Sequence, residues 1–305
     1  MQKLFAILMT LTLLMTTACA QADAIRIGVM SGPTGMGMAK LMSDANDAYA
    51  FEIYSAPTDA TADLASGTLD MLCLPTNTAA SLSMAKENFI SALAVNCLGT
   101  LYIVTDAETE IASVADLAGM TICAGVPSST TGPILASIFA QNSIDVNIEW
   151  EADHDAVVAR LIQGTIHAAV LPEPKVTVAL TKAEGWRVAL NVSEMWDAVY
   201  ETRLPMGCIV ARNEFIAANK DAVDQFLTDY SASIAFIGDP ANQQESAAMI
   251  ADAGVLPSAG VAGKALANLY GAIVYEDGAD MKNDLAAFYD VTGQAQPADA
   301  FYYEK

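Results

Sequence analysis

Several short segments rich in hydroxyl and amide side chains follow apolar runs, and they are where this sequence could bind a small polar molecule. Hydroxyls, amides and the free N–H groups at helix starts bind polar or anionic groups. The candidate ligand-binding residues are Ser31, Gly32, Thr34, Gly35, Ser55, Thr76, Asn77, Ser128, Ser129, Thr130, Thr131, Glu173 and Trp196.

Each of these residues has a structural alternative. Ser, Thr and Asn are favoured helix caps in any protein. Glu173 could meet a ligand amine or ring N–H, or it could instead favour the positive end of a helix dipole. Trp196 could stack on a flat ligand or pack inside the protein. The sequence alone leaves these alternatives open.

Catalytic chemistry finds little support in the residue pattern, and no catalytic residue is predicted. The two histidines, His154 and His167, stand outside the candidate loops, and His167 is expected inside a buried strand. No His, Asp and Glu cluster has the spacing of a zinc site, so no metal ligand is predicted. Gly32, Gly35 and Gly37 fit neither G-x-G-x-x-G nor a G-K-[ST] loop, so no nucleotide or other cofactor is predicted.

The chain is acidic, apolar and long enough for real cores. It has 305 residues, of which 53% are hydrophobic, which argues against disorder. It has 36 Asp and Glu against 14 Lys and Arg, a formal net charge of −22. Nucleic-acid binding needs a basic patch, so no nucleic-acid partner is predicted.

An internal repeat organises the first two thirds of the chain. Residues 25–35 and 122–132 share six of eleven identities, and residues 67–75 and 164–172 share four of nine. Both matches have an offset of 97, so the two copies align without a gap. Ser31 then pairs with Ser128, and Thr34 with Thr131.

Hydrophobic periodicity inside the copies predicts alternating strands and helices. Alternation of this kind is typical of parallel sheets with right-handed crossovers. We therefore expect an α/β fold with two βαβαβ lobes. The predicted strands are 25–30, 51–54, 69–74, 120–126, 146–150 and 166–171, and the predicted helices are 35–44, 58–66, 133–142 and 155–163.

Two apolar runs connect the predicted lobes and predict a hinge. They are residues 98–105 and 205–212, each expected as one connecting strand. Lobe 1 is predicted from residues 23–103 and 207–305, and lobe 2 from residues 104–206. Further helices are expected at 213–238, 240–253, 258–271 and 279–292.

Residues 1–22 have the features of a secretory signal peptide, with Lys3 before a short apolar run. The run is too short to cross a membrane alone. Processing at Cys19, as in a lipoprotein, and cleavage at an A-x-A site near residue 22 both remain open. Either route exports the mature chain, with a lipid anchor as its only membrane contact. The other four cysteines, Cys73, Cys97, Cys123 and Cys208, sit in apolar stretches and are expected as buried free thiols.

The sequence resembles the substrate-binding proteins of bacterial ABC importers of the nitrate, sulfonate, taurine and thiamine-pyrimidine-precursor type. The motifs that carry the resemblance are I-R-I-G-V-M-S-G-P-T-G-M-G at 25–37, G-T-L-D-M-L-C-L-P-T-N at 67–77, L-G-T-L-Y-I-V at 98–104, A-S-V-A-D-L-A-G-M-T-I at 112–122 and A-A-V-L-P-E-P at 168–174. The resemblance implies the periplasmic-binding-protein type II fold with two hinge strands. It also implies a monomer that captures a ligand by lobe closure and docks on an ABC permease.

The ligand does not follow from the resemblance. Apart from Lys175, the candidate loops hold no Lys or Arg, which argues against a strongly anionic ligand. A small polar or heteroaromatic ligand suits Glu173 better. A binding protein of another transporter class, or an enzyme on the same fold related to thiamine-pyrimidine synthesis, remains the alternative.

Overall fold

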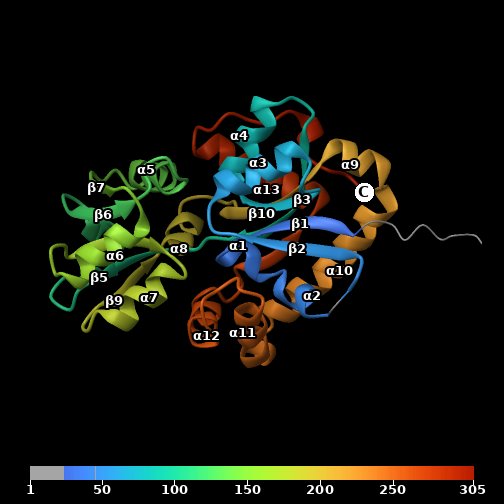
Figure 1. Cartoon of the computed structure of the whole chain (residues 1–305). Helices are drawn as coiled ribbons and strands as arrows, with labels where there is room; N and C mark the ends of the chain where they lie inside the picture. Colours follow the sequence, from blue (N-terminus) through green and yellow to red (C-terminus); the bar gives the residue numbers. More distant parts are fainter. Residues whose placement is uncertain (1–23, 45) are drawn as a thin grey trace, which may run out of the picture.

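The computed structural model describes residues 24–44 and 46–305, so the predicted signal peptide and Cys19 lie outside the described residues. The chain forms two α/β lobes, each built on its own sheet, and lobe 2 is the green and yellow half of Figure 1. Among the described residues, no helix combines the length and the apolar character needed to cross a membrane.

The sheet of lobe 1 has six strands in the order β11-β4-β10-β3-β1-β2. Its three sequence-adjacent strands β1, β2 and β3 run parallel, whereas β10, β4 and β11 add antiparallel pairs. The strands are β1 (Ile25–Met30), β2 (Tyr49–Tyr54), β3 (Met71–Pro75), β4 (Ile90–Leu98), β10 (Pro205–Arg212) and β11 (Ile273–Glu276).

The sheet of lobe 2 has five strands in the order β7-β6-β8-β5-β9. Here β6, β7 and β8 are parallel, and β5 pairs antiparallel with both β8 and β9. The strands are β5 (Leu101–Thr105), β6 (Thr121–Gly125), β7 (Asn147–Glu151), β8 (Ala168–Pro172) and β9 (Arg187–Asn191).

Helices cover both sheets. In lobe 2 they are α5 (Thr131–Gln141), α6 (His154–Ile162), α7 (Lys175–Lys182) and α8 (Val192–Asp197), with the 3-10 turn η1 (Val114–Leu117). In lobe 1 they are α1 (Pro33–Met36), α2 (Ala39–Ser43), α3 (Pro57–Ser66), α4 (Thr76–Ala85), α9 (Asn213–Ala218), α10 (Lys220–Gly238), α11 (Gln243–Asp252), α12 (Ala259–Asn268) and α13 (Gly278–Val291), with the turns η2 (Pro240–Asn242) and η3 (Asp299–Phe301).

The repeat at offset 97 is a repeat of structure. Strand β3 (Met71–Pro75) moved by 97 residues coincides with β8 (Ala168–Pro172), and α3 likewise overlaps α6. In both lobes the first strand of the copy lies between the second and the third. The two-lobe α/β prediction is therefore confirmed, and equivalent loops stand at equivalent sheet edges.

The predicted connecting strand 98–105 is wrong as one element. Strand β4 ends at Leu98 in one sheet, and β5 begins at Leu101 in the other. The change of sheet falls at Gly99 and Thr100, four residues before the predicted boundary at 103/104. A Cβ built on Gly99 would lie 1.6 Å from the Oγ of Ser193, so this crossover needs glycine. The return boundary at 206/207 falls inside β10, which begins at Pro205.

Two predicted helices are interrupted in the structure. The predicted helix 35–44 is α1 and α2, because the Ser233 hydroxyl of α10 donates to the carbonyl oxygen of Gly37 (2.7 Å) and accepts from the N–H of Leu41 (3.0 Å). The predicted helix 213–238 breaks at Asn219 into α9 and α10.

A third predicted helix ends early, ahead of a strand that was not predicted. The predicted helix 258–271 ends at Asn268, and Gly271 turns the chain at a φ of 77°. The chain then enters β11, where Ile273 pairs with Cys97 of β4. Strand β9 and helices α4, α7 and α8 were also absent from the prediction.

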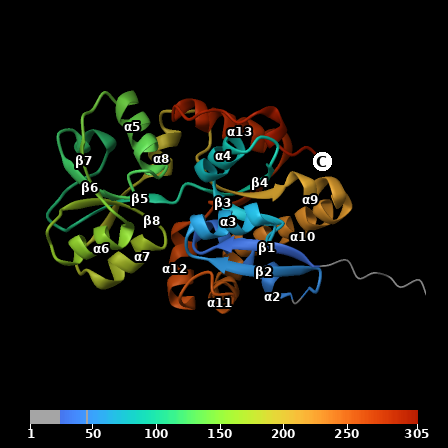
Figure 2. The same cartoon turned by 45° about the horizontal axis from the view of Figure 1, so that its top comes forward.

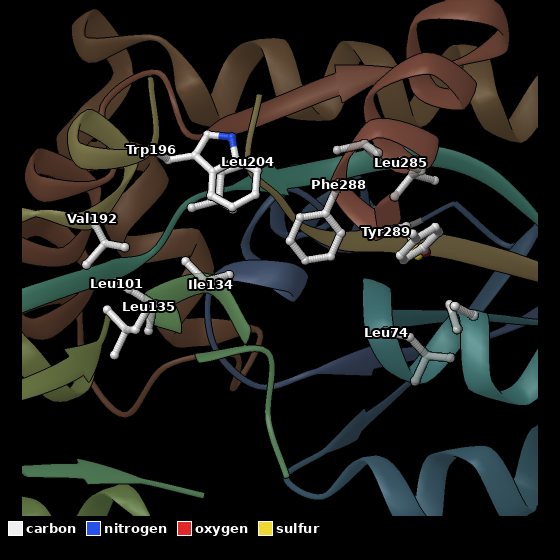
Figure 3. Packing of buried hydrophobic residues seen from close by; sticks show 14 of the residues in the cluster. Leu74, Leu101, Ile134, Leu135, Val192, Trp196, Leu204, Leu285, Phe288 and Tyr289 are labelled. Carbon is white, nitrogen blue, oxygen red and sulfur yellow. The ribbon is translucent and has the colours of Figure 1, made fainter. Parts of the chain in front are cut away.

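One apolar core passes between the lobes. Figure 3 shows Trp196 of α8 beside Leu204 and Phe288 at the centre of this cluster, between Leu74 of lobe 1 and Leu101 of lobe 2. The two lobes therefore share buried surface in addition to the two chain crossovers. The four described cysteines are buried and unpaired, as predicted.

Candidate ligand-binding site

The predicted loops lie where parallel strands end, on the edges of the two sheets that face each other. Ser31 and Gly32 follow β1, Thr76 follows β3, and Ser128 and Ser129 lie in the loop after β6. Ligands in open parallel sheets bind beyond the carboxyl ends of the strands. The edges approach each other, because a Cβ built on Gly32 would lie 3.9 Å from the Cδ of Pro174 in lobe 2.

The helices that start from these loops are not capped by side chains. The residues at the N-cap positions of α1, α4, α5 and α7 are Gly32, Pro75, Thr130 and Pro174, and none accepts a hydrogen bond through its side chain. Helices α6, α8 and α12 are capped, by Asp153, Asn191 and Ser258, whereas α3, α10, α11 and α13 also lack a side-chain cap. No N-cap side chain takes a first-turn N–H group at these helix starts, although at α7 the N–H of Thr177 already donates to the carboxylate of Glu173.

The loop before α5 offers the densest group of donors. Ser128 is exposed and Ser129 partly exposed, whereas Thr130 and Thr131 are buried. The Ser129 hydroxyl accepts from the N–H of Thr131 at 3.3 Å, the one cap-like contact of this loop among the described hydrogen bonds. Hydroxyls and N–H groups at the start of an eleven-residue helix suit an anionic or strongly polar group.

On lobe 1, several predicted residues have structural roles. The Thr76 hydroxyl donates to the carbonyl oxygen of Pro205 (3.0 Å) and is fully buried. Gly35 packs on its own strand, because a Cβ there would lie 2.1 Å from the carbonyl oxygen of Met30. Ser31 and Ser55 are exposed at the loop surface, and Thr34 and Asn77 are partly exposed. The exposed and partly exposed members are the ones that remain accessible to a ligand.

Trp196 is not a ligand-stacking residue in this structure, which corrects that prediction. Its side chain is fully buried, and its indole Nε1 donates to the carbonyl oxygen of Thr202 (3.0 Å). Tyr200 lies against it with ring centroids 4.5 Å apart. The packing alternative is confirmed, because an apolar ring of this size is most stable in the core.

Glu173 is buried, with only 2% of its surface exposed, and its carboxylate is occupied by protein donors. It accepts from the N–H and the hydroxyl of Thr177, each at 3.2 Å, and from the side-chain amide of Asn268 on lobe 1. Burial raises the pKa of Glu173 above its ordinary value, and these hydrogen bonds oppose the rise. Its place at the start of α7 agrees with the helix-dipole alternative.

His154 is a further candidate site residue, one that sequence reasoning missed. It is the first residue of α6, directly beside the strand that leads into the Ser128 loop: a Cβ on Gly125 would lie 2.8 Å from its Nδ1. That nitrogen is buried and has no hydrogen-bond partner among the described residues. Burial lowers the pKa of His154, and the positive charge of Lys175 lowers it further. The repeat gave the signal, since moving Ser55 by 97 residues leads to the loop just before His154.

His167 lies elsewhere. It was expected inside a buried strand, but β8 begins one residue later and the His167 side chain is 71% exposed. Its Nδ1 lies 2.6 Å from a carboxylate oxygen of Asp106. Among the described residues, no group of three or more His, Cys, Asp or Glu side chains could hold a metal ion.

The cavities near the exposed ring of Tyr270 are not lined by the predicted loops, although one lining residue, Asn268, contacts Glu173. One of about 270 Å³ is lined by the crossover residues Gly99 and Leu204 together with Asn191 and Asn268. None of the predicted ligand-binding residues lines this cavity or its neighbours around Tyr270. The candidate site is therefore defined by the chemistry of facing loops.

Solved structures with the same architecture include proteins described as transport proteins. The chain resembles an ABC transporter protein from Parabacteroides distasonis with a TM-score of 0.77 and 18% identity, covering 93% of this chain and 99% of that one. It resembles the aliphatic sulphonate-binding protein SsuA of Escherichia coli with a TM-score of 0.72 and 19% identity over 92% of each chain. At these identities the likeness establishes the fold, which is that of type II periplasmic binding proteins.

A comparison with curated protein sequences gave no match. The sequence model of a transport family, described as "ABC transporter, phosphonate, periplasmic substrate-binding protein", matches residues 39–258, which is well over half of the chain. That span contains the loop before α5, His154 and Glu173. With its two-lobed fold and its facing polar loops, the chain belongs to this family of periplasmic substrate-binding proteins of ABC importers.

Proposed function

We propose that this protein binds a small oxyanion of the phosphonate class between its two lobes and delivers it to the permease of an ABC importer. The observation that carries the proposal is the uncapped start of α5, with Ser128, Ser129, Thr130 and Thr131 around it. A helix N-terminus with hydroxyl groups is suited to an anion. The family description names phosphonate, in agreement with this chemistry.

Positive charge beside the loop supports an anionic ligand. Lys175 begins α7; burial lowers the pKa of His154 and the positive charge of Lys175 lowers it further, while the carboxylates of Asp153 and Asp155 oppose the decrease. The Lys175 ammonium contacts the exposed carboxylate of Asp155 at 2.5 Å, which leaves it at the protein surface. A bound anion would gain from Lys175 and from protonation of His154. The sequence argument against an anionic ligand considered only four loops, and none of these loops contains His154.

The heteroaromatic or cationic ligand is the second candidate, and Glu173 is the residue that favoured it. In the structure its carboxylate already accepts from Thr177 and Asn268. A ligand amine would have to replace the Asn268 amide. The occupied carboxylate therefore favours the oxyanion.

The expectations about lobe movement, export, oligomeric state and lack of catalysis belong to the same proposal. We propose that the division into two lobes is a division into two moving bodies, that the protein acts as an exported monomer, and that it is not an enzyme. The processing of Cys19 decides between a lipid-anchored and a free form. The lipid anchor is tested by expressing the wild type and Cys19→Ala and comparing the amount and the electrophoretic mobility of the protein in the membrane fraction.

A thermal-shift screen tests the ligand class, because a ligand that binds only the folded state raises the melting temperature. The panel is methylphosphonate, phosphate, taurine, nitrate, a methylated pyrimidine and a primary amine. We expect a phosphonate to give the largest shift. A shift produced only by the pyrimidine or the amine would contradict the oxyanion proposal, and turnover of any compound would contradict the binding-protein proposal.

A matched pair of variants locates the site. Thr131→Val removes a hydroxyl at the start of α5 and keeps the side-chain shape, and we expect it to weaken phosphonate binding about tenfold or more, as for a hydrogen bond to a charged group. Thr165→Val makes the same change on the exposed far side of lobe 2, and we expect no effect. Equal affinities in calorimetry for Thr131→Val and the wild type would place the ligand elsewhere.

A further inference from the structure

Helix α12 of lobe 1 contacts buried polar groups of lobe 2 through its last residue, Asn268. The side-chain amide of Asn268 donates to a carboxylate oxygen of Glu173 in lobe 2. The hydroxyl of Tyr102, on β5 of lobe 2, donates to the backbone carbonyl oxygen of Asn268. One residue of lobe 1 is thus joined to two elements of lobe 2.

The lobe 2 partners in these contacts are shielded from water, whereas Asn268 itself is exposed. Glu173 is 2% exposed, Tyr102 is 5% exposed and Thr177 is 3% exposed. A buried carboxylate that loses a donor is costly, and the cost is greater than the gain from an exposed hydrogen bond. Farther along the same helix, the ammonium of Lys264 donates to the exposed Thr181 hydroxyl at 3.3 Å, a peripheral contact.

Helix α12 is fixed to lobe 1, so the contact reports on the position of the lobes. Its residues Ala262, Ala265 and Leu266 are buried in the core cluster of lobe 1 that also holds Ile250 of α11. Figures 1 and 2 show α11 and α12 on one face of the lobe 1 sheet and α13 on the other. Movement of lobe 2 away from lobe 1 would break the Asn268 contacts without unfolding α12.

On the other face the lobes meet through α5 and α13. The Ser137 hydroxyl of α5 donates to the carbonyl oxygen of Val291 (3.0 Å), beside the shared apolar core. That side has a large nonpolar contact, whereas the α12 side depends on a few directional hydrogen bonds. Directional contacts of this kind have two states, made and broken, and small changes there shift the balance between conformations.

We infer that Asn268 is a latch residue that sets the balance between open and closed lobes. It does so by holding Glu173 at the rim of the ligand site. The latch acts both with and without a bound ligand. The consequence for affinity rests on the proposed function, whereas the effect on lobe position does not. The apparent dissociation constant equals the intrinsic one divided by the fraction of protein in the binding-competent form. If the closed form is the competent one, a latch that raises its population strengthens the apparent affinity. Glu173 is then a positioning residue at the edge of the site.

Charge variants at the contact test the latch. Asn268→Asp puts a second carboxylate against Glu173, and we expect the ratio of closed to open protein to fall more than tenfold. Asn268→Ala removes the amide donor alone, and we expect a smaller fall of about three- to tenfold. In the double variant N268D/E173Q, an amide at position 173 again faces an acceptor at position 268, and we expect the closed form to return. Lys264→Ala is the matched control, because it changes an exposed contact of the same helix.

The distribution of distances between the lobes is the readout. Spin labels at exposed positions 62 of α3 and 159 of α6, measured by pulsed electron resonance, need no ligand. Circular dichroism melting confirms that each variant folds. An unchanged distance distribution in folded Asn268→Asp would overturn the latch. A shifted distribution restored by E173Q, in a protein that binds no phosphonate, would support the latch and contradict the proposed function.

Discussion

Trp196 and Phe288 lie with their ring centroids 6.0 Å apart, and this contact joins α8, after the last strand of lobe 2, to α13 of lobe 1. Both side chains are fully buried (Figure 3). The core cluster around them contains strand residues of both sheets, such as Leu72 and Ile122. The lobes therefore share part of their folding free energy.

Replacing Trp196 by Ala should destabilise the whole protein. The change leaves a cavity at the junction, and large-to-small core changes of this size cost about 3–5 kcal/mol. We expect urea unfolding of Trp196→Ala, followed by far-UV circular dichroism, to shift to a lower midpoint in one transition. Trp150→Ala, at a partly exposed ring on β7, is the control and should shift little. A wild-type midpoint for Trp196→Ala would show that the junction carries no stability.

Gly99 should tolerate no side chain while Ser193 is present. A Cβ at position 99 would lie 1.6 Å from the Ser193 Oγ and 2.9 Å from its Cβ. We expect Gly99→Ala to cost about 1–3 kcal/mol through overpacking at the crossover. Removing the Ser193 side chain should relieve the clash, so the double variant G99A/S193G should recover part of the loss in the same urea experiment. Equal stability of the single and double variants would contradict this explanation.

Asp70 should make stability depend on acid pH. It is buried directly before strand β3 of lobe 1, where Arg212 (2.8 Å) and Arg26 (2.6 Å) contact its Oδ1. Burial alone would raise the pKa of Asp70, but the hydrogen bonds from Arg26 and Arg212 hold it below its ordinary value. A carboxyl with a depressed folded-state pKa stabilises the protein above its unfolded-state pKa, and that contribution is lost as pH falls through the folded-state pKa.

Asp70→Asn removes this contribution. We expect it to cost about 3 kcal/mol at pH 7, because it removes the buried carboxylate partner of Arg212 and leaves that guanidinium only the exposed carboxylate of Glu214. The difference from the wild type should begin to shrink as pH falls below about 4, where the unfolded-state carboxyl becomes protonated, and should shrink further as pH falls through the lower folded-state pKa. Urea unfolding at a series of pH values measures it. A difference that stays constant from pH 7 to pH 3 would mean that charge plays no part.

His154 should make ligand affinity depend on pH. Burial and the charge of Lys175 lower its pKa, so His154 is neutral at pH 7 in the free protein. An anion bound beside it would favour the protonated ring, so binding takes up a proton and affinity rises as pH falls. Calorimetry with the phosphonate between pH 5 and pH 8 measures this.

A pair of histidine variants separates the pH dependence caused by the protein from the pH dependence caused by titration of the ligand. We expect His154→Gln to flatten the pH dependence that remains after the ligand's contribution is subtracted. His167→Gln, at an exposed ring beside Asp106, should leave the wild-type profile unchanged. Identical profiles for His154→Gln and the wild type would remove His154 from the site.

The sequence by itself determined the architecture of the chain. A buried parallel strand is a continuous apolar run, and polar loops must follow it, so local composition located the strands and the candidate loops. The offset of 97 then matched β3 to β8 and the loop at Ser31 to the loop at Ser128. These features are local or repeated, so they can be predicted without knowing which residues pack against them.

Only the tertiary structure decided which residues face the site. Burial of Trp196 depends on Phe288, 92 positions away, and the occupation of Glu173 depends on Asn268, in the other lobe. The side that a residue faces is set by what packs against it. The strand β11 likewise exists because its edge partner β4 offers hydrogen bonds. Long-range contacts of this kind leave no periodic pattern in the sequence, because the distance between partners along the chain is set by topology.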